Sequence, residues 1–418
     1  MLTKGGGPSK DGGLTQGRGP TRGFGAGVGS RVVRKARGRV ARTGDVGPGT
    51  AARIVRTIWQ HPRISRIDIA ERLSLDKSTV TNQVNRLIGL GLVEEMDEGS
   101  ASVRGGRRPI HLGISRGYGL VIGIEVQVES WLAVAVDLSG AVLAEARGRA
   151  RLEPDNVGEA MLKIINEAKA RLCAPASRLL GIGVGTGGLV DPKKSLIRYS
   201  VPLRLSSPLD FGKVVASRLS VPCLIENDAN CCAWGELAFS HDEELRDFLF
   251  LLAEYRHDEQ SLGMYGGLGV GFGIVLGGKV YAGAHGNAGE FRSVFCDGPG
   301  DLQFSLPKEE LQRLESEGAT LGKAVDELAR NVAMLVNTFD IERVYIGGDI
   351  ENLDVDFPAL LRRRLEENWM YPFPKDVRIL NSSLKERAVA YGAAGMILDR
   401  LISGKGLLVV EDRAVTAR

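Results

Sequence analysis

The stretch that decides the fold reads GIGVGTGGLVD and covers residues 181–191. A second motif, IENDAN, covers residues 225–230. The apolar run at 223–226 predicts a short buried strand that leads into a helix, so Asn227 and Asp228 stand at the end of that strand. Polar groups at such an end converge on a cleft, and the sequence therefore predicts a binding site there.

A carboxylate beside an amide suits a ligand that is rich in hydroxyl groups. Asp228 can accept hydrogen bonds from two neighbouring sugar hydroxyls, and the amide of Asn227 supplies both a donor and an acceptor. The alternative is that the pair forms a turn or a helix cap, which is the more common role of an isolated Asn-Asp pair. The motifs around the pair favour the ligand site.

Four motifs together resemble one family. With GLGVGFGIV at residues 267–275 and GAHGNAGE at 283–290, they follow the order of the ROK family (repressors, open reading frames and sugar kinases). The resemblance implies an α/β, actin-like, two-lobed domain of the sugar-kinase type. In kinases of the family the aspartate that matches Asp228 is the general base, the glutamate that matches Glu290 holds other sugar hydroxyls, and the glycine that matches Gly187 lies near the sugar. The predicted ligand-binding residues are Gly187, Asn227, Asp228 and Glu290.

The strand pattern supports a duplicated domain. A run of three predicted strands is repeated later in the chain, and helices alternate with strands after each run. The strands are predicted at 120–126, 131–138, 142–147, 248–252, 269–276 and 279–281. We assign the first lobe to 118–235, with a C-terminal helix at 387–403 that completes it, the second lobe to 236–386, and a tail to 404–418. The small residues of that helix, between Ala390 and Gly395, predict a core contact with the first lobe.

Residues 50–117 predict a winged helix-turn-helix domain of three short helices and a hairpin. Ser65 and Asp68 form a capping-box pattern, and Asp76 can cap the third helix. The third helix presents polar side chains opposite its apolar face, and a basic wing follows it. The predicted DNA-binding residues are Lys77, Ser78, Thr79, Thr81, Asn82, Asn85, Arg86, Arg104, Arg107 and Arg108. The pattern resembles a MarR- or ROK-type winged helix; the alternative is a protein-interaction module.

The net charge of +3 conceals an uneven distribution. Residues 1–49 carry ten basic and two acidic residues, and residues 50–112 carry ten basic and seven acidic residues, which leaves −8 on the remainder. A basic front indicates a polyanionic partner at that end only. We expect the glycine-rich stretch 1–49 to be a disordered basic tail. The chain has no apolar run of the ~20 residues that a membrane span needs and no secretory core, so we expect a cytoplasmic protein without a membrane partner.

Two departures from the family pattern argue against catalysis. The family kinases have Asp-x-Gly-x-Thr where residues 125–129 read EVQVE, and the threonine of the second phosphate loop is Leu268 here. Valine resists the backbone angles that glycine permits, and Glu129 repels a triphosphate. Gly347-Gly348 still resembles the nucleotide-side turn. We therefore expect no kinase activity and no cofactor.

The zinc loop of the family is also missing. The chain continues from Glu290 as Phe291-Arg292-Ser293, and only Cys296 of the expected cysteines lies nearby. No tetrahedral Cys/His site can form locally, so we expect no metal. The loop from Phe291 to about Leu306 must be held by packing or be mobile. Arg292 either meets an anionic group of the ligand or forms a surface salt bridge.

These observations predict a DNA-binding transcriptional regulator, a repressor of carbohydrate genes. Two subunits of a homodimer, or of a higher oligomer, would place two winged helices on operator DNA, and a sugar-like effector in the cleft would shift their affinity. Two alternatives remain. One is an active ROK sugar kinase with an appended DNA-binding domain, and the other is a regulator with an empty cleft that a protein partner controls.

Overall fold

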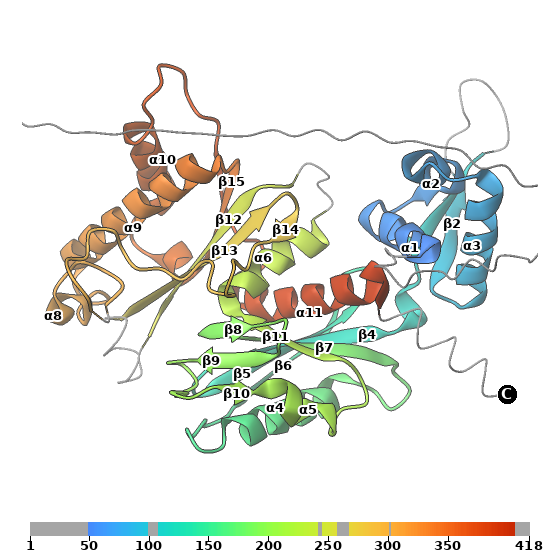
Figure 1. Cartoon of the computed structure of the whole chain (residues 1–418), viewed down its shortest axis with the longest axis horizontal. Helices are drawn as coiled ribbons and strands as arrows, with labels where there is room; N and C mark the ends of the chain where they lie inside the picture. The colour runs from blue at the N-terminus through green and yellow to red at the C-terminus, as the bar shows by residue number, and fades with distance from the viewer. Residues whose placement is uncertain (1–48, 99–107, 241–244, 257–266, 301, 406–418) are drawn as a thin grey trace, which may run out of the picture. The chain divides into compact units, whose positions relative to one another are not determined.

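The computed structural model describes residues 49–98, 108–240, 245–256, 267–300 and 302–405 (Figure 1). Residues 1–48 of the predicted N-terminal tail lie outside these ranges. Arg104, Arg107 and residues 406–418 lie outside them as well. Among the described residues, no helix combines the length and the apolar character that crossing a bilayer requires.

The winged helix-turn-helix forms around one small apolar core. Its elements are α1 Thr50–Gln60, β1 Ile64–Ser65, α2 Arg66–Leu73, α3 Lys77–Gly89, β2 Val93–Glu98 and β3 Ile110–Ile114. The three strands pair in the order β1-β3-β2. Ile54, Ile69 and Val84 are fully buried, one from each helix, because apolar residues recur at helical spacing.

Both cap predictions can be compared with the structure. The Ser65–Asp68 capping box is confirmed, with the Ser65 hydroxyl accepting from the Asp68 backbone N–H and the Asp68 carboxylate accepting from the Ser65 N–H. Asp76 occupies the N-cap position of α3, but its side chain makes no capping hydrogen bond, so that part of the prediction is wrong.

The first lobe is built on a five-stranded sheet in the order β11-β7-β4-β5-β6. Its elements are η1 Arg116–Tyr118, β4 Leu120–Val126, β5 Ser130–Asp137, β6 Val142–Arg149, α4 Val157–Leu172, β7 Leu179–Thr186, β8 Leu189–Asp191, β9 Leu196–Tyr199, β10 Leu209–Asp210, α5 Phe211–Ala216, β11 Cys223–Asn227 and α6 Asp228–Phe239. The strands β4, β5 and β6 are antiparallel, β7 pairs with β4 in parallel, and β11 pairs with β7 in parallel.

The second lobe repeats this topology in the order β14-β13-β12-β15-β16. Its elements are β12 Phe248–Tyr255, β13 Leu268–Leu276, β14 Lys279–Val280, α8 Lys308–Leu311, α9 Gly318–Phe339, β15 Arg343–Gly348, η2 Asp349–Asn352, α10 Phe357–Glu367, β16 Arg378–Asn381 and η3 Lys385–Arg387. The first three strands are again antiparallel and the last two parallel. The predicted duplication is confirmed.

The C-terminal helix α11 Ala388–Arg400 lies between the sheet of the first lobe and α6. The backbones approach so closely that a Cβ on Gly392 would overlap the carbonyl oxygen of Cys231 in α6. The predicted core contact is therefore confirmed. The helix ends at Arg400, short of the predicted residue 403, and a π-helical turn, η4 Leu401–Lys405, follows it.

The loop that follows Glu290 is held by packing. The Phe291 ring makes edge contacts with Phe272 and Phe304. The Gln303 amide donates to the carbonyls of Val270 and Phe291 and accepts from the N–H of Val270. Contacts between aromatic rings and the hydrogen bonds of the Gln303 side chain thus hold this loop in place without metal ligands.

Candidate ligand cleft and nucleic-acid interface

The predicted ligand-binding residues come together in one pocket. Gly187 follows β7, Asn227 ends β11, Asp228 begins α6, and Glu290 is bridged to Gly271 of β13. All four line a pocket of about 40 Å³. The parallel pairing of β7 and β11 brings their carboxyl ends to the same edge, which is why residues 40 positions apart meet there.

Asn227 and Asp228 divide the two roles that the sequence left open. The side-chain oxygen of Asn227 accepts from the Asn230 N–H and caps α6, and its amide donates to the Gly188 carbonyl at 3.1 Å. Asp228 accepts from the Ala229 N–H through one oxygen at 2.8 Å. Its other oxygen lies beside Gly187, where a Cβ would come within 3.0 Å. The cap is real for Asn227, while the Asp228 carboxylate lines the pocket.

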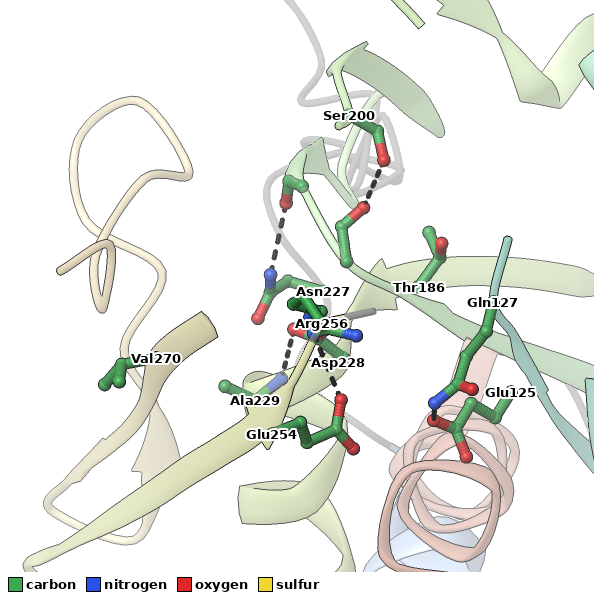
Figure 2. A network of polar contacts seen from close by, with 12 residues as sticks. Glu125, Gln127, Thr186, Ser200, Asn227, Asp228, Ala229, Glu254, Arg256 and Val270 are labelled. Carbon is green, nitrogen blue, oxygen red and sulfur yellow. Dashed lines mark hydrogen bonds and ion pairs between the residues drawn. The ribbon is translucent and has the colours of Figure 1, made fainter. Parts of the chain in front are cut away.

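Two charged residues of the site were not predicted. Glu254 and Arg256 lie at the end of β12, and Arg256 lines the pocket (Figure 2). The Arg256 guanidinium is 3.0 Å from the Glu254 carboxylate and 3.8 Å from that of Asp228. The rule that polar residues gather at strand ends would have indicated both, because they follow the predicted strand 248–252.

Burial weakens the acidity of several carboxyls around the cleft. Desolvation, followed by the charge of Asp228, raises the pKa of Glu290 to about 7, although this side chain keeps contact with solvent. Burial also raises the pKa of Glu254, against the opposing influence of Arg256. Glu290 is therefore shared between its neutral and charged forms near neutral pH, and it can donate as well as accept hydrogen bonds.

A larger cavity of about 970 Å³ adjoins the pocket, and the two share Leu252 and Arg256. Glu125 and Gln127 of the first lobe line it opposite Glu254 and Asp349. Glu125 is buried, and this burial, followed by the charge of Glu254, raises its pKa to about 8. The side chain of Gln127 donates to Glu125 at 2.7 Å, and this hydrogen bond links the two polar side chains at the start of the stretch 125–129.

The side chain of Arg292 is exposed in the loop after Glu290, and its predicted contact with a ligand anion or in a surface salt bridge stays a prediction. Its guanidinium donates to the carbonyl of Gly298 at 2.8 Å and so braces its own loop. It does not line the ligand pocket. Within the described residues, no cluster of three or more His, Cys, Asp and Glu side chains has metal-binding geometry.

The predicted DNA-binding residues of α3 form one polar face. Lys77, Ser78, Asn82, Asn85 and Arg86 are exposed, whereas Thr79 and Thr81 are half-buried. The Thr81 hydroxyl donates to the Lys77 carbonyl within the helix. Arg108 is exposed before β3. The two other arginines of the wing lie outside the described residues.

Arg66 of α2 is a neighbour of this face that the sequence did not indicate. Its guanidinium donates to the Asn85 side chain at 3.2 Å and to Glu95 of β2 at 2.6 Å. It thereby holds one end of the polar face against the hairpin. These contacts support a preorganised surface of helix α3.

Two family models match the chain. Residues 49–97 match the MarR family, and residues 121–295 match the ROK family. The matched ranges cover the winged helix and the strands that carry Gly187, Asn227, Asp228 and Glu290.

The chain is similar to named repressors over most of its length. A "Putative xylose repressor" of Caldicellulosiruptor sp. is 26% identical over 84% of this chain and 95% of that protein. The "DNA-binding transcriptional dual regulator NagC" of Escherichia coli is 24% identical over 85% of this chain and 93% of that protein.

Solved structures share the fold. A ROK family transcriptional regulator, described as a homolog of the E. coli MLC protein, superposes with a TM-score of 0.67 and 20% identity, over 85% of this chain and 96% of that chain. A ROK hexokinase from Thermus thermophilus superposes with a TM-score of 0.51 and 20% identity, over 70% of this chain and 99% of that chain. At these identities the likeness concerns the fold.

Proposed function

We propose that this chain, in which a ROK-family domain follows a MarR-type winged helix, is a cytoplasmic transcriptional repressor that binds operator DNA and senses a sugar. The observation that carries the proposal is a single pocket lined by Gly187, Asn227, Asp228 and Glu290 in the same chain as a polar α3 face. The relatives named as xylose repressors and as NagC support a carbohydrate effector.

The winged helix is proposed as the DNA-reading element. The side chains of Lys77, Asn82 and Asn85 suit phosphates and base edges in a major groove, and Arg108 begins the described part of the wing. A homodimer would present two such helices to two half-sites of an operator. The boundary at 117/118 between this domain and the first lobe belongs to the same proposal.

A packed route leads from the pocket to the winged helix. Asp228 begins α6, α6 packs against α11, and the end of α11 contacts α1 through an ion pair between Arg56 and Asp399 at 3.4 Å. The Arg56 guanidinium also donates to the Ser403 hydroxyl at 3.2 Å. We propose that a sugar shifts DNA affinity by favouring one arrangement of these helices.

Kinase activity is proposed to be absent. Asp228, which would act as the base in a kinase, is paired with the Arg256 guanidinium at 3.8 Å, so this contact must be broken before the carboxylate can reach a sugar hydroxyl. Glu125 and Gln127 fill the turn where family kinases have small residues. A coupled ADP-release assay with a hexose panel tests this directly, and turnover above that of an Asp228→Asn variant would support the kinase alternative instead.

DNA binding is tested by selecting bound fragments from random DNA with the full chain, followed by fluorescence anisotropy on the selected sequence. We expect Asn82→Ala to reduce specific affinity roughly tenfold, because a good base contact contributes about 1–3 kcal/mol. Arg330→Ala, which removes an ion pair within α9, is the matched control on the second lobe. Failure to enrich any sequence would contradict the proposal.

Sugar sensing is tested by thermal shift across xylose, glucose, N-acetylglucosamine and related sugars. A ligand of the native state raises the melting temperature, and the Asp228→Asn variant should lose that rise. The active sugar should then change operator affinity, and Arg56→Ala should reduce this change while leaving sugar affinity as it was. No shift with any sugar would favour control by a protein partner.

A further inference from the structure

The pocket formed by the predicted ligand residues is too small for a sugar in this conformation. Its 40 Å³ is a few times the ~10–15 Å³ that a single water needs, whereas ligand pockets span about 300–1,000 Å³. The adjoining cavity of about 970 Å³ is separated from it by residues that line both, Leu252 and Arg256. Leu252 is buried within β12, and Arg256 is the partly exposed charged side chain at this boundary.

Arg256 is seated in a fitted position rather than directed into solvent. Its side chain is 16% exposed, and those of Asp228 and Glu254 are 15% and 18% exposed. The absence of a side chain at Gly269 makes room for it, because a Cβ there would lie 2.9 Å from the Arg256 Nε. Figure 2 shows the guanidinium beside Asp228, with Glu254 on the strand that carries it.

We propose that Arg256 is a plug that the ligand must displace from Asp228, and that it makes the cleft selective for uncharged, polyhydroxylated ligands over anionic ones. The inference rests on the proposed sugar cleft and names the chemistry that the cleft accepts. When Arg256 withdraws toward Glu254, its closer partner, the small pocket and the larger cavity join. Two sugar hydroxyls can then donate to Asp228 in place of the guanidinium.

An anionic ligand meets an unfavourable field in the same place. Asp228 lines the pocket, and Glu254 and Asp349 stand behind Arg256 along the larger cavity. An anion would have to recruit Arg256 away from Glu254, and a buried carboxylate would then lose its compensating charge. A neutral ligand leaves that ion pair intact. A phosphate or carboxylate on the sugar is therefore disfavoured although an arginine is present.

The test compares free sugars with their phosphate esters on the full chain by titration calorimetry. Xylose, glucose and N-acetylglucosamine are each paired with the corresponding terminal phosphate. We expect the free sugar of the recognised pair to bind at least about 100-fold more tightly, since like charges placed together in a binding site cost several factors of ten.

Two variants test the residue itself. Glu254→Gln releases Arg256 and should narrow the preference for the free sugar by about tenfold, because the guanidinium can then serve an anion. Glu351→Gln, in the larger cavity, is the matched control and should leave the preference unchanged. Arg256→Gln removes the plug and should tighten binding of the free sugar severalfold. Circular dichroism and melting curves confirm that each variant is folded.

The outcomes separate this inference from the proposed function. A phosphate ester that binds as tightly as its free sugar would overturn the inference and leave the sugar cleft in place. A folded Arg256→Gln variant that no longer binds the free sugar would overturn the plug. If neither the free sugars nor their phosphate esters bind, the carbohydrate cleft itself is rejected, and the inference with it.

Discussion

Glu125 provides a direct test of the electrostatics of the cleft. The residue is 7% exposed, and burial together with the charge of Glu254 raises its pKa from 4.5 to about 8. The folded protein therefore holds Glu125 in its neutral form at pH 7, while the unfolded chain releases the proton. Replacing it with glutamine keeps the shape and an acceptor for the Gln127 amide, and removes the ionisation.

The direction in which stability changes with pH follows from proton binding by Glu125. Between pH 4.5 and pH 8 the folded state holds the Glu125 proton more tightly than the unfolded state, so stability is fully present below pH 4.5 and is lost as the pH rises through 8. A single acid with these two pKa values lowers the free energy of unfolding by about 4 kcal/mol between pH 5 and pH 9. Glu226, whose pKa burial raises to about 7, acts in the same direction and remains in the variant.

Urea denaturation at pH 5, 7 and 9 measures the effect. We expect Glu125→Gln to lose less stability across this range than the native chain, by up to about 4 kcal/mol, with its largest advantage at pH 9. Glu129→Gln, at an exposed position of the same turn, is the control and should follow the native chain. Parallel pH profiles for Glu125→Gln and the native chain would refute a neutral Glu125 in the fold.

Three further changes test the packing. Gly392→Ala should lower the free energy of unfolding by about 2 kcal/mol or more, because the added methyl overlaps the Cys231 carbonyl. Gly322→Ala, in an open stretch of α9, should raise it by up to about 1 kcal/mol. Urea melts measure both values, and equal effects would contradict the tight α6–α11 contact. Phe304→Ala should lower the free energy of unfolding by about 3–5 kcal/mol, since the ring is fully buried against Phe291, and a loss below 1 kcal/mol would show that the loop is not held by packing. Ser65→Ala should cost about 1 kcal/mol through loss of the capping box, as read from the melting temperature, and an unchanged value would mean that the cap contributes nothing.

Local patterns carried most of the fold prediction. The strand predicted at residues 120–126 has the observed bounds, because its apolar run matches the length of the buried element. Strand ends were predicted less well: β12 extends to Tyr255, beyond the predicted run 248–252. Pairing with neighbouring strands continues past the point where the residues stop being apolar.

The residues of the site were likewise predicted where a local pattern marks them and missed where it does not. Asn227 and Asp228 were found because they follow a strand directly and belong to a recognisable motif. Arg256 was missed, because its importance comes from contacts with Asp228, 28 positions earlier, which only the approach of the two lobes creates. Both predicted roles of Arg292 stay predictions, because its side chain is exposed and the hydrogen bond to the Gly298 carbonyl uses only one of its donors.

The sequence by itself determined the repeated run of three strands, the three-helix core with its capping box, and the residues at the ends of β7 and β11, since each depends on neighbours within a few positions. Only the tertiary structure decided the state of the cleft. Whether Glu125 is charged, whether the pocket is open and which partner Arg256 takes depend on desolvation and on charges that long-range folding brings together, and no local pattern encodes those distances.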